Sequence, residues 1–294
     1  MTNKVLFSII VPTYNRAALI GYTIQSLLDQ SYDNFEIIIV DDGSTDNTEE
    51  IIKNHYQSKV KYYKIKNSER AYARNYGVSK STGDYINFFD SDDIALPNHL
   101  AEASTAIKVL NPEVFHLNYA LKNANKLIYN NNNNYPEANH ILLKGNNLSC
   151  NGVFLRRDVI LQNKFNENRA LSASEDWELW LRLSARFKIH LIPVITSYII
   201  NHDERSVLDF NEIKLISRTN ELIKSLQEDD IFCQKFPCAS VKIKAHMLSY
   251  ISLHAALAKK KKTSLYYLKR AIKTNWRELF TRRFLGILKT LTIQ

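Results

Sequence analysis

Residues 85–93 read Tyr85-Ile86-Asn87-Phe88-Phe89-Asp90-Ser91-Asp92-Asp93, a short apolar run that ends in three carboxylates within four positions. The aromatic and β-branched residues of the run are typical of a buried strand. Crowded carboxylates repel one another unless a cation lies among them, and oxygen ligands favour hard ions such as Mg²⁺ or Mn²⁺. The alternative is a polar turn that caps the next helix, where Asp is common.

The segments before this stretch alternate between strand and helix patterns. Strands are predicted over 4–12, 35–40 and 60–65, and helices over 17–30, 70–80 and 97–110. This alternation predicts an α/β fold with a mostly parallel sheet flanked by helices. Ligands of such sheets bind at the carboxyl ends of the strands. Tyr14, Asp41, Asp42 and the acidic cluster 90–93 all follow predicted strands, so we expect them in one crevice.

The second half of the chain carries another acidic pair at the start of a predicted helix. Residues 174–183 form an amphipathic pattern whose first turn contains Glu175 and Asp176. Taken without context, acids at this place are better explained by the positive end of the helix dipole, because first-turn acids are common. Strands are predicted over 189–192 and 197–200, and a loop over the asparagine run 130–134.

Length and composition indicate a globular protein. A chain of 294 residues, 45% of them apolar, is long enough to bury a sizeable core. It can form one large domain or one domain with an appendage. No stretch approaches eighteen consecutive apolar residues and no signal peptide is evident, so we expect a cytoplasmic protein. The three cysteines fit neither a paired disulfide framework nor a CxxC metal site. We expect them to be reduced.

The net charge of +9 comes from the C-terminal tail. Residues 255–294 carry eleven Lys or Arg and one acid, a local charge of +10, so the other 254 residues carry 28 bases and 29 acids. This distribution argues against a nucleic-acid groove and for a separate role of the tail. Helices are predicted over 212–226, 241–258, 264–274 and 276–291.

The last predicted helix has an apolar stripe that includes Trp276 and Phe280, with Arg277, Arg282 and Arg283 on or beside the opposite side. Such a basic amphipathic helix suits the surface of an anionic membrane. The alternative is a helix that packs on the body of the protein. The preceding run of lysines at 259–262 favours anionic lipid.

Five motifs follow one another along the chain. They are Ser8-Ile9-Ile10-Val11-Pro12-Thr13-Tyr14-Asn15, Val40-Asp41-Asp42-Gly43-Ser44-Thr45-Asp46, Ala73-Arg74-Asn75-Tyr76-Gly77, Asp90-Ser91-Asp92-Asp93 and Glu175-Asp176. Together and in this order they resemble the motifs of the inverting glycosyltransferases of family 2, which have the GT-A fold. The resemblance covers roughly residues 4–207. One departure is Asn67-Ser68-Glu69-Arg70, where family members often have small residues, so the resemblance does not define the path of this loop next to the donor.

The resemblance implies an enzyme that moves a sugar from a nucleotide-sugar, expected to be a UDP-sugar, to an acceptor hydroxyl. The residues implied to bind the donor are Pro12, Thr13, Tyr14, Asn15, Asp41, Asp42, Arg74, Asp90, Ser91, Asp92 and Arg205. The metal site for Mn²⁺ or Mg²⁺ is implied at Asp92, with Asp93, Asp90 and His202 as further candidates. His202 is equally explained as a loop histidine that hydrogen-bonds to the backbone. The implied general base is Asp176, with Glu175 as its companion.

These roles agree with the chemistry of the reaction. A divalent cation neutralises the charge of the departing diphosphate, and one carboxylate takes the proton of the attacking hydroxyl. We predict a catalytic domain over 1–208, with a nucleotide-binding half over 1–95 and an acceptor-binding half over 96–208. The region 209–294 is predicted to be helical.

The predicted partners are a glycan or lipid-linked saccharide acceptor and the anionic inner face of the plasma membrane, to which the protein binds peripherally. A homodimer is left open. The activity is predicted to serve bacterial surface polysaccharide synthesis. Two other functions remain open: a non-catalytic sugar-nucleotide-binding or scaffold protein, and a different enzyme on a similar sheet, a nucleotidyltransferase or an oxidoreductase. The chain has neither a GxGxxG after its first strand nor a GxxxxGK[ST] motif.

Overall fold

The computed structural model describes residues 4–123, 126–130, 135–201 and 210–292, and its contacts divide the chain into two compact units. The first unit consists of Met1–Ala138, Leu148–Glu167 and Phe187–Arg205. The second consists of Asn139–Asn147, Asn168–Arg186 and Ser206–Gln294. Each unit is therefore built from separate stretches of sequence. The predicted division at residue 208, into a catalytic domain and a helical C-terminal region, stays a prediction.

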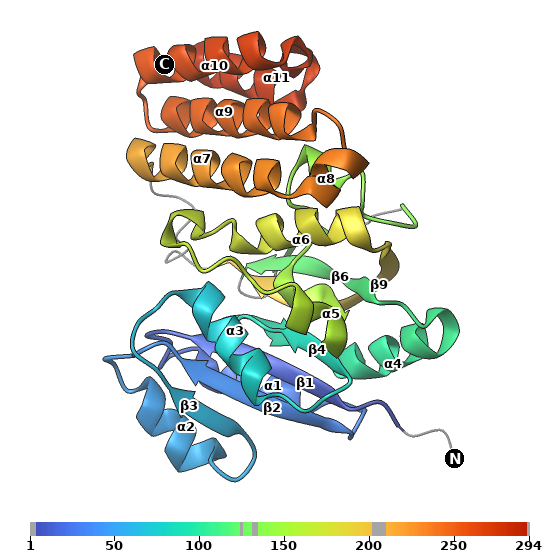
Figure 1. Cartoon of the computed structure of the whole chain (residues 1–294). Helices are drawn as coiled ribbons and strands as arrows, with labels where there is room; N and C mark the ends of the chain where they lie inside the picture. Colours follow the sequence, from blue (N-terminus) through green and yellow to red (C-terminus); the bar gives the residue numbers. More distant parts are fainter. Residues whose placement is uncertain (1–3, 124–125, 131–134, 202–209, 293–294) are drawn as a thin grey trace. The chain divides into compact units, whose positions relative to one another are not determined.

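A nine-stranded sheet forms the centre of the first unit (Figure 1). Its strands are β1 (Phe7–Thr13), β2 (Phe35–Asp41), β3 (Lys61–Lys64), β4 (Tyr85–Phe88), β5 (Ile94–Ala95), β6 (Val114–Asn123), β7 (Lys126–Asn130), β8 (Val153–Arg156) and β9 (Ile189–Ile200). Their order is β3-β2-β1-β4-β8-β6-β9-β5, and β7 pairs with β6.

The sheet is mixed. β3, β2, β1 and β4 run parallel to one another, as the sequence predicts. Beyond β4 the pairings of β8 are antiparallel, β6 is parallel to β9, and β5 is antiparallel to β9. The parallel half places the carboxyl ends of β1, β2 and β4 on one edge of the sheet.

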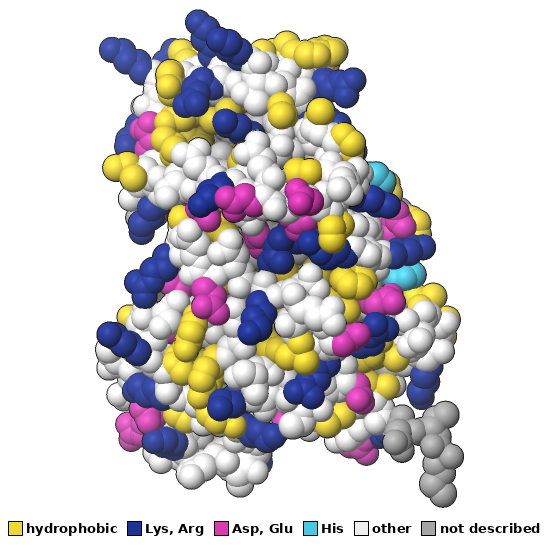
Figure 2. All heavy atoms as spheres, viewed as in Figure 1, with side chains coloured by type: hydrophobic (Ala, Val, Ile, Leu, Met, Phe, Trp, Pro, Cys, Tyr) yellow, Lys and Arg dark blue, Asp and Glu magenta, His cyan; other side chains and the backbone are white. Residues whose placement is uncertain are grey.

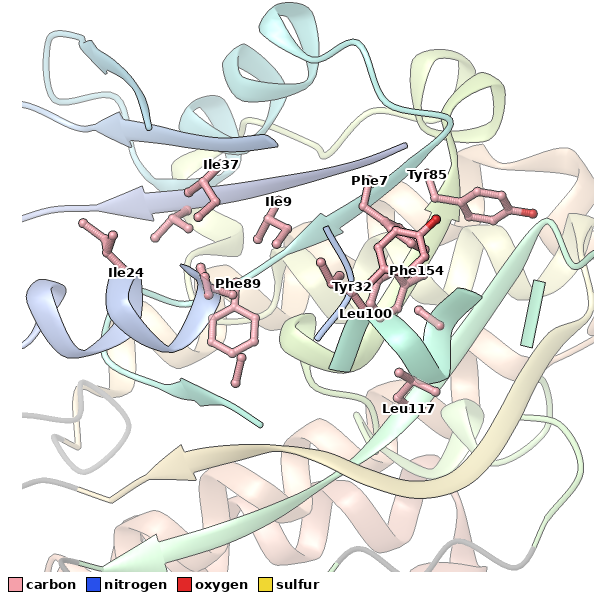
Figure 3. Packing of buried hydrophobic residues seen from close by; sticks show 14 of the residues in the cluster. Phe7, Ile9, Ile24, Tyr32, Ile37, Tyr85, Phe89, Leu100, Leu117 and Phe154 are labelled. Atoms are coloured by element: carbon pink, nitrogen blue, oxygen red, sulfur yellow. The ribbon is translucent and has the colours of Figure 1, made fainter. Parts of the chain in front are cut away.

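Helices cover both faces of this sheet. They are α1 (Ile20–Leu28), α2 (Thr48–Tyr56), α3 (Arg70–Lys80), α4 (His99–Leu110) and α5 (Arg157–Gln162). The core on one face contains Ile24 of α1, Leu100 of α4 and the aromatic residues around Phe7 (Figure 3). Phe7 meets Tyr32 and Phe154 edge to face, with ring centroids 5.4 and 5.7 Å apart.

The opposite face of β1 packs against α3. A Cβ atom on Gly77 would lie 2.4 Å from Cγ2 of Ile10, so the helix approaches the strand more closely than a larger residue permits. This contact sets the position of the whole helix, including Arg74 one turn earlier.

The second unit is helical (Figure 1). Its elements are η1 (Leu142–Lys144), η3 (Arg169–Leu171), α6 (Glu175–Arg186), α7 (Glu212–Glu228), α8 (Asp230–Lys235), α9 (Ala239–Leu257), α10 (Lys261–Thr274), η4 (Trp276–Phe280) and α11 (Arg282–Thr292). The remaining short helix, η2 (Cys150–Gly152), belongs to the first unit. α9 contacts α7, α10 and α11, and buried residues such as Leu215, Ile251 and Ala271 fill the space between α7, α9 and α10.

The structure corrects two predicted elements. Residues 189–200 form one strand and not the two that the sequence pattern predicts. Pro193 and Val194 lie within this strand, at an irregularity where the pairing with β6 shifts from Leu117↔Ile192 to Asn118↔Ile195 and then continues. The predicted helix over 276–291 is wrong: Thr281 has an extended backbone and separates η4 from α11. Of the asparagine run, Asn130 ends β7 and residues 131–134 lie outside the described residues.

Candidate functional site

Two loops at the carboxyl edge of the sheet are tied together. The loop after β1 and the loop after β2 share hydrogen bonds from Asn15 N to Ser44 Oγ and from Thr45 N to Asn15 Oδ1, both 2.9 Å. Arg16 N also donates to Thr48 Oγ1 at 2.9 Å. The structure therefore brings together two of the predicted donor-binding segments.

The residues at the end of β1 differ in exposure. Pro12 is buried, whereas the side chain of Tyr14 is 45% exposed. Thr13 is buried, and its hydroxyl has no hydrogen-bond partner among the residues that the structure describes. Buried hydroxyls are usually paired, so Thr13 is an exception at the end of β1.

The carboxylates of Asp41 and Asp42 bond to different parts of the chain. Asp41 Oδ1 accepts from Ser44 N at 2.7 Å and Oδ2 accepts from the hydroxyl of Tyr62 at 2.7 Å, which fixes the turn after β2. Asp42 accepts from Ser68 N at 2.7 Å and from Glu69 N at 2.9 Å. Asp42 thereby holds the start of α3.

Glu69 lies in the loop that departs from the family pattern. Its backbone φ is +76°, a value that residues other than glycine rarely adopt. The hydrogen bond from Glu69 N to Asp42 supports this backbone, so Asp42 shapes the loop as well as the helix start.

Arg74 is almost completely buried and bonds to the acidic cluster. Its Nη2 lies 3.0 Å from Asp90 Oδ1, and its guanidinium stacks over the ring of Phe165 at 5.2 Å. Burial of a cation is costly unless it is paired, so the contacts with this carboxylate and this ring compensate for the burial of Arg74. Arg74 therefore orients Asp90.

The three acids of the cluster have different surroundings. Asp92 Oδ2 lies 3.4 Å from Nε of Arg16, and both side chains are partly exposed. Asp93 points inward: Ile200 N donates to its Oδ1 at 2.8 Å and Asn151 Nδ2 donates to its Oδ2 at 2.7 Å. Burial, followed by repulsion from Asp90 and Asp92, raises the pKa of Asp93. Asp93 thus joins β9 to the turn.

Asn151 is a residue that the sequence analysis missed. It is fully buried, donates to Asp93, and accepts from Asp90 N at 2.8 Å through its Oδ1. Its backbone oxygen accepts from Nδ2 of Asn87 on β4 at 2.8 Å. One amide therefore fixes both ends of the acidic turn. In the sequence, Asn151 lies between Cys150 and Gly152 and belongs to no recognisable motif, so no signal in the sequence indicates its role.

The acidic turn can supply two outward carboxylates to a cation. Within the described residues, no three His, Cys, Asp or Glu side chains form a group that could hold a metal ion together. Mg²⁺ commonly uses one or two carboxylates together with phosphates and water, so Asp90 and Asp92 fit such an ion bound with its substrate. The buried Asp93 is already bonded on both oxygens.

The remaining candidates lie outside this turn. Ser91 is buried beside the acidic residues. Glu175 and Asp176 begin α6 in the second unit, where Asp176 Oδ2 accepts from Nδ2 of Asn146 at 2.8 Å. His202 and Arg205 lie outside the described residues.

No helix among the described residues has the length and hydropathy that crossing a membrane requires.

Two solved structures with a similar fold were determined with bound nucleotide-sugars. TarS 1–349 of S. aureus in complex with UDP-GlcNAc gives a TM-score of 0.66 at 18% identity, over 92% of this chain and 91% of that one. The mannosyltransferase PcManGT of Pyrobaculum calidifontis, in complex with GDP-Man and Mn²⁺, gives 0.58 at 15% identity, over 99% and 87%. The protein therefore has a GT-A-like α/β fold with a helical C-terminal region.

The sequence relatives differ in length. An uncharacterized glycosyltransferase of Rickettsia bellii is 32% identical over 61% of this chain, which spans 26% of that protein. A protein of Escherichia coli described as UDP-Glc:alpha-D-GlcNAc-diphosphoundecaprenol beta-1,3-glucosyltransferase WfaP is 32% identical over 75% of this chain and 86% of its own length. The chain spans about a quarter to a half of the Rickettsia and Haemophilus relatives that it matches. The family model described as Glycosyl transferase family 2 matches residues 8–165, and the chain belongs to that family.

Proposed function

We propose that this protein is an inverting glycosyltransferase that transfers a sugar from a UDP-sugar to a hydroxyl of a lipid-linked saccharide in bacterial surface polysaccharide synthesis. The observation that carries the proposal is the similarity to the E. coli glucosyltransferase over most of both chains, since its name specifies a UDP-sugar and a diphosphate-linked lipid acceptor.

The first unit supports the proposed donor site. The tied loops after β1 and β2 offer the exposed ring of Tyr14 at the edge where such sheets bind ligands. Asp41 and Asp42 keep the second loop and α3 in place, and Asn15 joins the loops. We assign the nucleotide to this edge.

In the proposed mechanism, Asp90 and Asp92 would hold Mg²⁺ or Mn²⁺, which supplies positive charge for the departing diphosphate. Arg74 orients Asp90, and Arg16 lies beside Asp92. Asp176 takes the proton of the acceptor hydroxyl as that oxygen attacks the anomeric carbon. A single displacement inverts the configuration, so no residue of the chain forms a covalent intermediate.

The C-terminal helices support a proposed membrane contact. Trp276 and Phe280 of η4 and Leu285 of α11 are 61%, 78% and 64% exposed. Figure 2 shows hydrophobic side chains next to Lys and Arg over this part of the molecule. Exposed aromatic and aliphatic side chains among cations suit the interface of an anionic membrane. We therefore propose that the protein works at the inner face of the plasma membrane.

A panel of nucleotide-sugars tests the proposed function. Thermal unfolding is followed with UDP-glucose, UDP-GlcNAc and GDP-mannose, each with and without Mn²⁺, and turnover is followed as transfer to a GlcNAc-diphosphate-lipid acceptor. We expect a UDP-sugar to protect the fold and to react, because ligands that bind only the native state stabilise it.

In Asp176→Asn, turnover should collapse while UDP protection persists. The exposed Asp158→Asn is the control. Equal loss of protection and turnover in Asp176→Asn would contradict the assignment of the base.

A further inference from the structure

We propose that the C-terminal helices position the catalytic carboxylate: Arg283 and His246 hold the loop from which Asn146 binds Asp176. The inference rests on the proposed role of Asp176 as the base. All of these residues belong to the second unit, and Arg283 and His246 lie beyond the residues 8–165 that the family model matches.

The first step is the contact at Asp176 itself. Asn146 Nδ2 donates to Asp176 Oδ2 at 2.8 Å, and Trp177 N donates to Oδ1 at 2.7 Å. Both oxygens are thereby oriented. Asn147 stiffens the loop, because its Nδ2 donates to the backbone oxygens of Gly145 at 3.0 Å and Ile141 at 3.2 Å.

The second step joins this loop to α9. Gly145 has a φ of +145°, and a Cβ atom there would lie 3.3 Å from Nε2 of His246. The backbone of the loop therefore rests against the imidazole. The same imidazole meets the indole of Trp177 edge to face, with centroids 5.9 Å apart, and Trp177 Nε1 donates to Leu142 O at 2.9 Å. His246 thus supports both the loop of Asn146 and the residue after Asp176.

The third step joins His246 to α11. Arg283 Nη1 donates to the backbone oxygen of His246 at 2.8 Å and to Ser249 Oγ at 3.2 Å, and its Nη2 lies 3.1 Å from His246 Nε2. The guanidinium also stacks over Tyr250 at 5.6 Å. Burial and the charge of Arg283 lower the pKa of His246 to about 3, so the imidazole is neutral and accepts from the arginine.

Arg283 therefore differs from the neighbouring cations of the tail. The sequence pattern places it with Arg277 and Arg282 on or beside the side opposite the apolar stripe, and this is wrong for Arg283, whose guanidinium turns inward onto α9. Burial lowers the pKa of Arg283. A partly buried guanidinium that holds one side chain through several contacts is a positioning group, since planar arginine donors fix geometry.

The test compares Arg283→Gln, Asn146→Ala and their double variant in the full chain. The probes are UDP for binding and the UDP-sugar of the panel above with the highest turnover. We expect about tenfold lower kcat in each single variant, because small misplacements of a catalytic group are costly. The KM for the donor and the protection by UDP should stay unchanged. The double variant should lose no more than the larger single loss, because residues on one path are not additive.

Lys242→Gln removes an equal charge from the exposed side of α9 and should keep wild-type kcat. If Arg283→Gln does not fold, Arg283→Lys replaces it and should give a smaller loss of kcat in the same direction. A wild-type kcat in Arg283→Gln would overturn the inference, and so would a kcat loss in the double variant equal to the product of the two single losses. An inactive Asp176→Asn would leave the proposed function intact in either case. A fully active Asp176→Asn would overturn the role of the base, and the inference with it.

Discussion

Arg74 Nη2 lies 3.0 Å from Asp90 Oδ1, and the two side chains differ sharply in exposure, 2% for the arginine and 38% for the aspartate. The cation is thus the buried partner, and it holds a carboxylate that faces outward. Arg74, which the resemblance implies to lie near the donor, thereby orients Asp90, a candidate metal ligand, from the buried side.

Replacing Arg74 with Gln should cost stability and metal-dependent donor binding together. Loss of one partner of a buried pair costs about 3–5 kcal/mol, and the exposure of Asp90 reduces this to about 2 kcal/mol. Urea denaturation measures the free energy of unfolding, with the exposed Lys80→Gln on the same helix as control. An Arg74→Gln variant as stable as Lys80→Gln would contradict the structural role.

Asp92→Asn should abolish the metal dependence of donor protection. The substitution keeps the shape of the side chain but removes the charge that a hard cation needs. The measurement is the thermal shift by UDP as Mn²⁺ is titrated, with Asp84→Asn at the amino end of β4 as control. An Mn²⁺ titration indistinguishable from that of the unaltered protein would exclude Asp92 as a ligand.

Two glycines should respond to alanine in opposite directions. At Gly152 a Cβ atom would lie 2.2 Å from the backbone oxygen of Leu117, whereas at Gly286 nothing lies within 4 Å. We expect Gly152→Ala to destabilise by about 3 kcal/mol and to disturb the adjacent Asn151. Gly286→Ala, inside α11, should stabilise by about 0.5–1 kcal/mol. Urea denaturation of both variants checks the signs, and a neutral Gly152→Ala would show that the backbone there moves freely.

Glu36 should make the fold sensitive to acid. Burial alone would raise the pKa of Glu36, but hydrogen bonds from Lys61, Ser8 and Thr82 outweigh it and lower the pKa to about 2. The stabilisation is therefore present above about pH 4.5, the unfolded value, and is lost as the pH falls toward 2. Glu36→Gln should cost about 2 kcal/mol at pH 7, after allowance for screening by solvent.

The same comparison at lower pH tests the sign. The difference in free energy of unfolding between Glu36→Gln and the unaltered protein should shrink between pH 4.5 and pH 2. The exposed Glu50→Gln is the control and should leave the stability unchanged over this range. A difference that is constant over this range would refute the linkage.

Replacing Trp276 and Phe280 with Ser should weaken binding to anionic vesicles. Loss of two exposed aromatic side chains should lower the partition coefficient about tenfold or more. Co-sedimentation with phosphatidylglycerol vesicles measures it, and Val109→Ser, an equally exposed apolar residue on α4, is the control. Unchanged sedimentation of the double variant would count against the proposed membrane contact.

The sequence predicted the elements that have strong periodic patterns. The helix over 70–80 and the strands that lead to Asp41 and Asp90 are confirmed, because each is followed by a clear end signal and the two strands are largely apolar runs. Short strands such as β5 and β8 escaped prediction, since their pairing partners are distant in sequence. The break at Thr281 carried a signal that was missed: its Oγ1 accepts from Phe284 N at 3.1 Å and caps α11.

The place of the acidic residues at one edge of the sheet follows from the sequence, but their hydrogen bonds do not. Strand-end reasoning places Asp42, Asp90 and Asp92 at one edge, because parallel neighbouring strands end together. It does not reveal that Asp93 turns inward to Ile200, or that Asn151 and Asn146 bond to the acids. These contacts join segments with no common pattern, so only the folded chain shows them.

The hydrogen bonds of Asn15 with Ser44 and Thr45 have a practical consequence for redesign. A transplant of the first loop from another sugar transferase, without its counterpart after β2, leaves the crossing donors and acceptors mismatched. Attempts to redesign the proposed nucleotide site should therefore exchange both segments as a matched set.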